Sequence, residues 1–283
     1  MKRRQFIQNS TLAAAAIGSS SGLLSSVRAG EFTGTIKKAV KYSMVKEPKL
    51  SHLDKFKMLK DVGFDGTELR GTDAPNLKEF SKAIEVSGLP VHGVVNGGNP
   101  DIAGAIEFSK ALGGNTVLVV AVYDKKKPYM ESWKGTQEVI RKALPVAEKH
   151  QVKILVENVW AGFLISPLDV VRYVDEIDSP WFGSYFDVGN NVRWGVPEHW
   201  IELINQRIGG KLDIKEWDEK LHQSKGLRAG FSKELGEGTI NWANVRAALK
   251  GIHFKGWATA EVRGGDRTRL ADIAQRMDKI LDL

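Results

Sequence analysis

Four acidic residues, each at the end of a short apolar run, are the part of this sequence best suited to chemistry. They are Glu157 in KILVENVW, Asp187 in GSYFDVGN, Asp213 in GKLDIKEW and Glu261 in WATAEVRGG. Unpaired carboxylates repel one another strongly at low effective dielectric, and a divalent cation removes that repulsion. The set of four therefore predicts a site for one divalent metal ion, although a salt bridge accounts for any one of them alone.

Two basic residues follow these carboxylates closely in the chain. Lys215 lies two residues beyond Asp213, on the same face of the predicted strand, so it can neutralise carboxylate charge or bind a substrate oxygen. Arg263 follows Glu261 by the same spacing. Both are therefore candidate substrate-binding residues.

Two further polar residues belong to earlier apolar runs. Glu68 in GFDGTELRG is a candidate substrate contact, with a structural ion pair to Arg70 as the alternative. His92 in PVHGVVNG is expected to end its strand and face the substrate, and the alternative is a hydrogen-bonded core histidine.

These residues can act together only in a fold that brings the ends of several strands to one place. The alternation of predicted strands and helices indicates such a fold. Short β-branched runs alternate with longer segments of helical period. Strands are predicted near 37–44, 64–70, 90–96, 115–122, 152–159, 182–188, 209–216 and 256–262. Helices are predicted near 51–62, 76–87, 101–112, 132–150, 167–177, 198–206, 241–250 and 268–282. Eight strand–helix units without a repeated glycine-rich phosphate loop predict a single-domain α/β protein, a closed (β/α)8 TIM barrel.

Residues typical of helix starts support the predicted positions of three helices. Ser51, Asn76 and Asn241 are predicted to cap the helices that follow them. The long segment from Glu219 to Thr239 is expected to be an irregular loop at the C-terminal face, where barrel loops build active sites. A solvated excursion without a role is the alternative for that loop.

The first 29 residues have the features of an export signal. KRRQFI at positions 2–7 is a twin-arginine pattern, and an apolar stretch and the small-residue tail VRA at 27–29 follow it. The apolar run is shorter than the roughly 20 residues of a spanning helix. We therefore expect a signal peptide over 1–29, a barrel over 30–283, a periplasmic or otherwise exported product, and no stable membrane insertion.

Net charge and amino-acid composition limit the kinds of ligand and partner expected for this chain. The chain carries a formal charge of +7, of which the signal supplies four positive charges, so the mature part carries +3. Basic residues alternate with acidic ones along most helical segments, whereas a nucleic-acid binder keeps a basic face. We therefore do not expect nucleic acid as a partner. Because the chain has no cysteine, any metal must be held by oxygen and nitrogen ligands.

The order of these motifs also resembles a known family. Glu157, an Asp followed by Gly-Asn, a D-I-K-E strand, G-E-G-T-I-N-W at 236–242 and G-W-x-x-x-E at 256–261 are similar to the xylose isomerase-like TIM barrels of the sugar phosphate isomerase/epimerase family, which include hydroxypyruvate isomerase and the ketose 3-epimerases. The resemblance implies that Glu157, Asp187 and Glu261 bind one divalent ion. It also implies that Glu157 and Glu261 form the acid/base pair.

Two positions depart from the family pattern. The family's strand-7 histidine ligand is Asp213 here, and a neighbouring histidine that holds substrate is Asn190. An additional carboxylate shifts the expected metal toward Mg2+ or Mn2+, with Co2+ or Zn2+ as alternatives.

We therefore expect an isomerase or epimerase that removes the α-proton of a small, unphosphorylated keto-sugar and passes through an enediolate. Two alternatives remain open at this stage. A lyase acting on 3-keto-glycosides begins with the same proton abstraction, and a sugar-binding barrel without catalysis tolerates both departures from the family pattern. A homo-oligomer is also compatible with the sequence.

Overall fold

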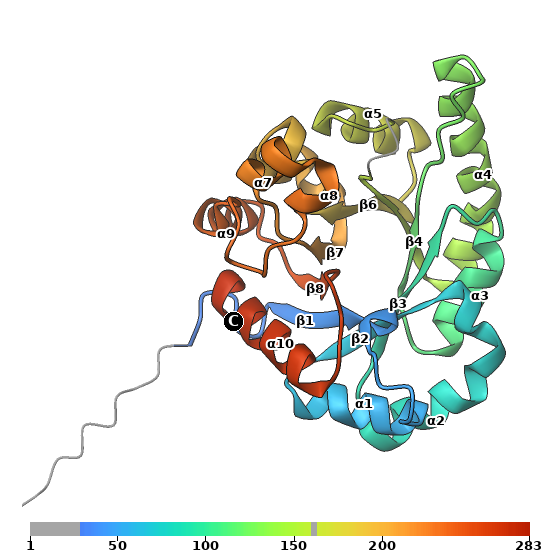
Figure 1. The fold of residues 1–283 in the computed structure, drawn as a ribbon. Helices are drawn as coiled ribbons and strands as arrows, with labels where there is room; N and C mark the ends of the chain where they lie inside the picture. Colours follow the sequence, from blue (N-terminus) through green and yellow to red (C-terminus); the bar gives the residue numbers. More distant parts are fainter. Residues whose placement is uncertain (1–28, 160–162) are drawn as a thin grey trace, which may run out of the picture.

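The computed structural model describes residues 29–159 and 163–283, whose strands form a closed parallel barrel (Figure 1). The strands are β1 (Ile36–Lys41), β2 (Gly66–Arg70), β3 (Val91–Gly97), β4 (Thr116–Val119), β5 (Lys153–Glu157), β6 (Phe182–Asp187), β7 (Ile208–Ile214) and β8 (Gly256–Ala260). Each strand pairs with its neighbours in sequence, and β1 pairs with β8 to close the ring. The predicted (β/α)8 barrel is confirmed.

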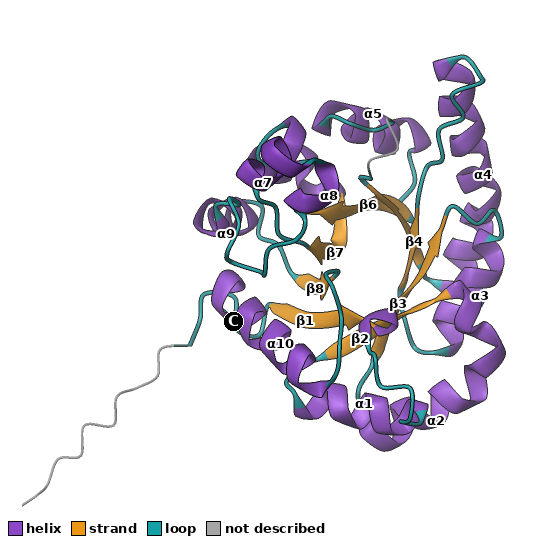
Figure 2. Cartoon of the chain, in the orientation of Figure 1, coloured by secondary structure: helices purple, strands orange, loops and turns teal. Residues whose placement is uncertain are grey.

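The helices lie outside this ring (Figure 2). They are α1 (His52–Asp61), α2 (Leu77–Ser87), α3 (Ile102–Ala111), α4 (Tyr129–His150), α5 (Pro167–Ile177), α6 (Pro197–Ile204), α7 (Glu219–Lys225), α8 (Leu227–Gly230), α9 (Trp242–Gly251) and α10 (Arg267–Leu281). Apolar helix faces pack on the outer face of the sheet and bury a continuous core. Every predicted strand and helix overlaps an observed one.

Two of the three predicted helix caps are present. The side chain of Ser51 accepts a hydrogen bond from the Asp54 amide, and that of Asn241 accepts one from the Asn244 amide. Helix α2 begins directly after Asn76, as predicted, but the Asn76 side chain makes no capping hydrogen bond, because a 3-10 helix that ends at Asn76 supplies the turn before α2.

The segment expected to be an irregular loop contains the short helices α7 and α8. The side chain of Asp218 caps α7 by accepting a hydrogen bond from the Leu221 amide at 2.8 Å. Figure 1 shows both helices between β7 and α9, on the side of the ring formed by β6 and β7. The signal predicted for the N-terminus falls almost wholly on residues outside the described ranges, and the described part of the chain has no helix long and apolar enough to cross a membrane.

Candidate active site

The four predicted carboxylates meet at the C-terminal mouth of the barrel. Glu157 and Asp187 are the last residues of β5 and β6, Asp213 is the next-to-last residue of β7, and Glu261 directly follows β8. One oxygen from each carboxylate lies within 4.8 Å of the corresponding oxygens of the other three. The strand register explains this, because Asp187 and Asp213 are direct partners across neighbouring strands.

Lys215 contacts three of these carboxylates, as its spacing from Asp213 predicted. Its Nζ lies 2.8 Å from Asp187 Oδ2, 2.8 Å from Glu261 Oε2 and 3.9 Å from Glu157 Oε1. Asn190 joins the same group, since its Nδ2 donates to Glu157 Oε1 at 2.9 Å and its Oδ1 accepts from Lys215 at 2.9 Å. Asn190 therefore orients both the carboxylate and the ammonium group.

The fourth carboxylate is held by Lys41, a residue that the sequence interpretation missed. Lys41 ends β1, and its Nζ lies 2.7 Å from Glu68 Oε2 and 2.9 Å from Asp213 Oδ2. Lys41 and Glu68 are direct partners in the β1–β2 register. The expected pairing of Glu68 with Arg70 is therefore wrong, because Arg70 lies on the exposed end of β2. A lysine at the end of the strand segment IKKAVK was the available signal for Lys41.

We call this group of seven side chains the mouth cluster, and it carries more negative than positive charge. Five carboxylates face two ammonium groups, which leaves three formal negative charges when every group is ionised. The members are Lys41, Glu68, Glu157, Asp187, Asp213, Lys215 and Glu261. Buried charge of one sign is costly unless a cation or protons balance it.

Burial and neighbouring charges move the pKa values of the two central glutamates in opposite directions. Burial raises the pKa of Glu157 to about 8, and this effect outweighs the opposing attraction of the Lys215 ammonium. Burial also acts to raise the pKa of Glu261, but the ammonium groups of Lys41 and Lys215 outweigh it and lower that pKa. Without a bound cation, Glu157 therefore holds its proton more readily than Glu261 does.

The donor set fits a divalent cation. Oδ1 of Asp213 is buried and accepts no hydrogen bond from the described residues. Burial raises the pKa of Asp213 well above its usual range and outweighs the attraction of Lys41, so Lys41 only partly compensates the negative charge of Asp213. Four convergent carboxylates form an all-oxygen set of the kind that Mg2+ and Mn2+ prefer.

His92 does not lie at the mouth, which corrects the expectation that it ends its strand. It is the second residue of β3, where Lys211 Nζ lies 2.9 Å from its Nδ1 and Thr259 Oγ1 lies 3.1 Å from its Nε2. Its ring stacks on Trp257 with centroids 4.6 Å apart. His92 is thus a satisfied core residue of a lower cluster, whose members are His92, Lys211, Trp257 and Thr259.

A cavity of about 440 Å3 adjoins the mouth cluster. This volume lies within the range of small-molecule sites. The segment between β7 and α9 forms part of its wall, which agrees with the expected place of that segment at the C-terminal face, and the predicted Arg263 also lines it. The lining residues are Lys215, Glu216, Arg228, Phe231, Glu261, Val262 and Arg263.

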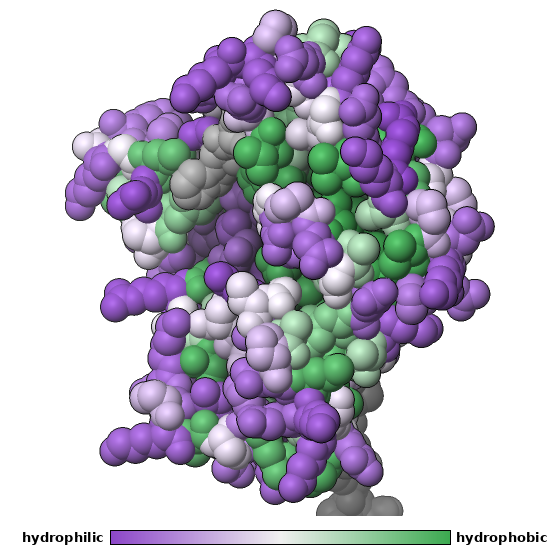
Figure 3. Space-filling view, turned by 90° about the vertical axis from the view of Figure 1, so that its right-hand side faces the viewer, coloured by the Kyte–Doolittle hydropathy of each residue, from purple (hydrophilic) through white to green (hydrophobic). Residues whose placement is uncertain are grey.

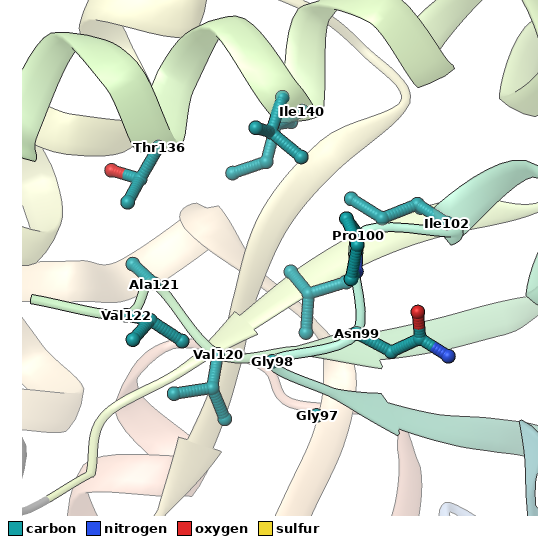
Figure 4. Close-up of a pocket in the computed structure, with 12 residues that line it drawn as sticks. Gly97, Gly98, Asn99, Pro100, Ile102, Val120, Ala121, Val122, Thr136 and Ile140 are labelled. Carbon is teal, nitrogen blue, oxygen red and sulfur yellow. The ribbon is translucent and has the colours of Figure 1, made fainter.

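A second pocket lies away from the carboxylates and is a poor candidate for chemistry. It lies between the segments after β3 and β4 and helix α4, and Ile140 of α4 is among the residues that line it (Figure 4). Its volume of about 120 Å3 is small, and its described lining residues include no titratable side chain. On the outer face near α4, hydrophobic residues gather among polar ones (Figure 3), as surfaces commonly show.

Comparison with protein families places this geometry in context. A family model described as "Xylose isomerase-like TIM barrel" matches residues 56–282 of this chain. The putative L-ribulose-5-phosphate 3-epimerase SgbU of Haemophilus influenzae is 28% identical over 155 residues, which cover 54% of this chain and 53% of that protein. The alignment therefore spans about half the length of this curated relative.

Solved structures share the fold at low sequence identity. The apo 3-keto-D-glucoside 4-epimerase YcjR from E. coli has a TM-score of 0.68 and 18% identity, and the alignment covers 87% of this chain and 98% of that one. The IOLI protein with a bound zinc atom has a TM-score of 0.68 and 17% identity, with the same coverage. At these identities the similarity establishes the fold and leaves the substrate to be argued from the site.

Proposed function

This chain belongs to the xylose isomerase-like TIM barrel family, and from that premise we propose that it is a metal-dependent isomerase or epimerase of an unphosphorylated keto-sugar. The observation that carries the proposal is the pair Glu157 and Glu261, which approach the same Lys215 ammonium from different strands of the mouth. The two carboxylates lie in different electrostatic environments, and such pairs can divide the roles of acid and base between them.

The chain's own residues then divide the proton transfers. One carboxylate of the Glu157–Glu261 pair accepts the proton from the carbon next to the substrate carbonyl, and a protonated carboxyl group of the pair delivers a proton to the resulting enediolate. A proton delivered to the opposite face of the same carbon gives an epimer. A proton delivered to the adjacent carbon gives an aldose–ketose isomer. Asn190 keeps Glu157 in position through its 2.9 Å hydrogen bond.

A divalent ion would be held by Glu157, Asp187, Asp213 and Glu261. When bound, it supplies the Lewis acidity that polarises a carbonyl oxygen. Lys41 balances Asp213 and Glu68 from the opposite side, so this chain tolerates a carboxylate where the family resemblance leads one to expect histidine.

A lyase that acts on 3-keto-glycosides is the second candidate. The chain shares its fold with a protein described as a 3-keto-D-glucoside 4-epimerase. The cavity of about 440 Å3 beside Glu261 provides space for a group larger than the reacting carbons. Elimination requires a leaving group β to the acidified carbon, whereas the proton abstraction is shared with the isomerase and epimerase reactions.

Solvent deuterium incorporation tests the shared step. The Mn2+-loaded protein is incubated in D2O with a panel of ketoses and 3-keto-glycosides, and NMR locates any deuterium and any elimination product. Glu157→Gln and Glu261→Gln keep the side-chain volume but remove the basic group, so each should lower incorporation by about 10^2 to 10^4-fold. Incorporation that persists in both variants rejects these residues, and none with any substrate favours a sugar-binding barrel.

Export through the twin-arginine signal is a separate proposal. It is supported by the KRRQFI pattern at positions 2–7 and the VRA tail at 27–29. Replacement of Arg3 and Arg4 by lysine should retain the protein in the cytoplasm without changing its unfolding temperature, because a receptor recognises the arginine pair. Cell fractionation and N-terminal sequencing measure this, and an uncut precursor stably inserted in the membrane would contradict it.

A further inference from the structure

The arginines around the β7–α9 segment fall into two groups. Arg269 pairs with Glu234 at 2.5 Å and with Asp272 at 2.8 Å. Arg276 likewise contacts Asp272 and Glu237, each at 2.8 Å. These two guanidinium groups fasten the segment to α10.

Arg228 and Arg263 differ from that pair. Both line the cavity beside the mouth cluster, and both are exposed. Neither guanidinium has a hydrogen bond or ion pair with a carboxylate among the described residues, although acidic residues are abundant in the same segment. Two free guanidinium groups on one cavity wall are the arrangement that recognises an anion.

The acidic residues that line this cavity do not pair with these two arginines. Glu216 is buried, and its two oxygens accept hydrogen bonds from the amides of Trp217 and Gly236 and from the Trp242 ring nitrogen. Glu261 faces Lys215 at 2.8 Å. Arg228 and Arg263 are therefore available to pair with an anionic ligand in this cavity.

We propose that Arg228 and Arg263 form a subsite for the carboxylate of a sugar acid, so that the substrate class is an anionic keto-sugar rather than a neutral one. This inference rests on the proposed function, because Lys215 and Glu261 define the reacting end of the same cavity. Phe231 and Val262 supply apolar lining between polar groups, against which the C–H face of a sugar ring packs. A carboxylate suits guanidinium groups because it accepts paired hydrogen bonds.

Isothermal titration of the wild-type protein with non-reacting probes tests the subsite. The probes are D-glucuronate and D-galacturonate, their neutral counterparts D-glucose and D-galactose, and D-glucose 6-phosphate. We expect at least one hexuronate to bind about tenfold or more tightly than its neutral counterpart, the size of one charge-assisted hydrogen bond. Arg228→Met and Arg263→Met should each remove most of that preference.

Lys225→Met is the matched control, because Lys225 is an exposed cation of α7 that does not line the cavity. It should leave the preference intact, since exposed charges at a distance are screened by salt. Equal binding of acids and neutral sugars, or a preference that survives both arginine variants, overturns the proposal. Tighter binding of the phosphate overturns the assignment to carboxylate.

These outcomes are distinguishable from a failure of the proposed function. The probes carry no ketone, so their binding is an equilibrium measurement that does not depend on proton abstraction. Selective hexuronate binding without deuterium incorporation would retain the subsite and reject the enzyme. Incorporation into neutral keto-sugars without hexuronate selectivity would retain the enzyme and reject the subsite.

Discussion

Two groups of buried polar side chains lie inside the same barrel, and they differ in how their charges are balanced. In the lower cluster, Lys211 and Thr259 hydrogen-bond the two ring nitrogens of His92, and Trp257 covers the ring. In the mouth cluster, five carboxylates surround two ammonium groups. Burial alone therefore does not mark a functional site, because both groups are buried.

The difference lies in what each group still requires. Burial lowers the pKa values of both His92 and Lys211, so the lower cluster tends toward neutral side chains that satisfy one another. The mouth cluster retains surplus negative charge and, at Asp213 Oδ1, a buried acceptor without a hydrogen bond from the described residues. Such an imbalance favours a bound cation, whereas the lower cluster is complete without a ligand.

The largest expected effect comes from removing the ammonium group between Asp213 and Glu68. Lys41→Met should destabilise the protein by about 3–5 kcal/mol, because it leaves two buried carboxylates uncompensated. Lys38→Met is the control on the same strand, since Lys38 pairs with the partly exposed Asp278, which water can still solvate, so its loss should cost less than the loss of Lys41. Urea unfolding measures both values, and equal losses would contradict the charge imbalance.

The next largest effect is expected on Mn2+ affinity, which should depend on the mouth cluster and not on the lower cluster. Asp187→Asn removes a charged candidate ligand but keeps its volume, and it should weaken Mn2+ binding by more than about 100-fold, beyond the loss typical of a group that only supports a ligand. His92→Gln in the lower cluster should leave Mn2+ affinity unchanged. Electron paramagnetic resonance of free Mn2+ gives both affinities. If only the His92 variant weakened Mn2+ binding, the metal site would lie in the lower cluster and our assignment would be wrong.

The pH dependence of Mn2+ binding follows from Glu157. Its pKa is raised to about 8 by burial, so below that pH the carboxyl group of the metal-free protein holds a proton that the ion must displace. Affinity should therefore rise with pH, by about tenfold per unit between pH 6.5 and 7.5, and level off above about 8.5. Glu157→Gln should make this profile shallower without flattening it, because burial also raises the pKa values of Asp187 and Asp213. An affinity that falls with rising pH would contradict the assignment.

The smallest effect concerns Lys211 in the lower cluster. Burial lowers its pKa from 10.5 to about 7, so between these values the unfolded chain binds more protons than the folded one. The contribution of Lys211 to stability should consequently increase as the pH rises from 7 toward 10, by less than about 1.4 kcal/mol per pH unit. Comparing urea unfolding of wild type and Lys211→Met at pH 7 and 9 measures it, and parallel pH profiles would refute it.

Local sequence patterns predicted most of the framework. Strand β6 was predicted at 182–188 and lies at Phe182–Asp187, while α5 was predicted at 167–177 and lies at Pro167–Ile177. These predictions succeed because periodicity, caps and helix-stopping glycines act over a few residues. The short helix α7 escaped notice because seven residues are too few to show a clear period.

The candidate site was predicted in part. Glu157, Asp187, Asp213 and Glu261 could be grouped from sequence, because each ends an apolar run and parallel strands in a barrel end at the same mouth. Lys41 was missed since one lysine at the end of a run gives no sign of its partners. Its pairing with Glu68 depends on the β1–β2 register.

Sequence alone thus determined which residues form strands and helices and which carboxylates end the later strands, because hydrophobic period and turn residues act locally. Only the tertiary structure decided how deep each polar side chain lies in the barrel and which side chains it contacts. Closure of the ring between β1 and β8 places Lys41 beside Asp213, and the β2–β3 register sets His92 below the mouth. Contacts between distant segments depend on strand register and barrel closure, which are properties of the whole sheet.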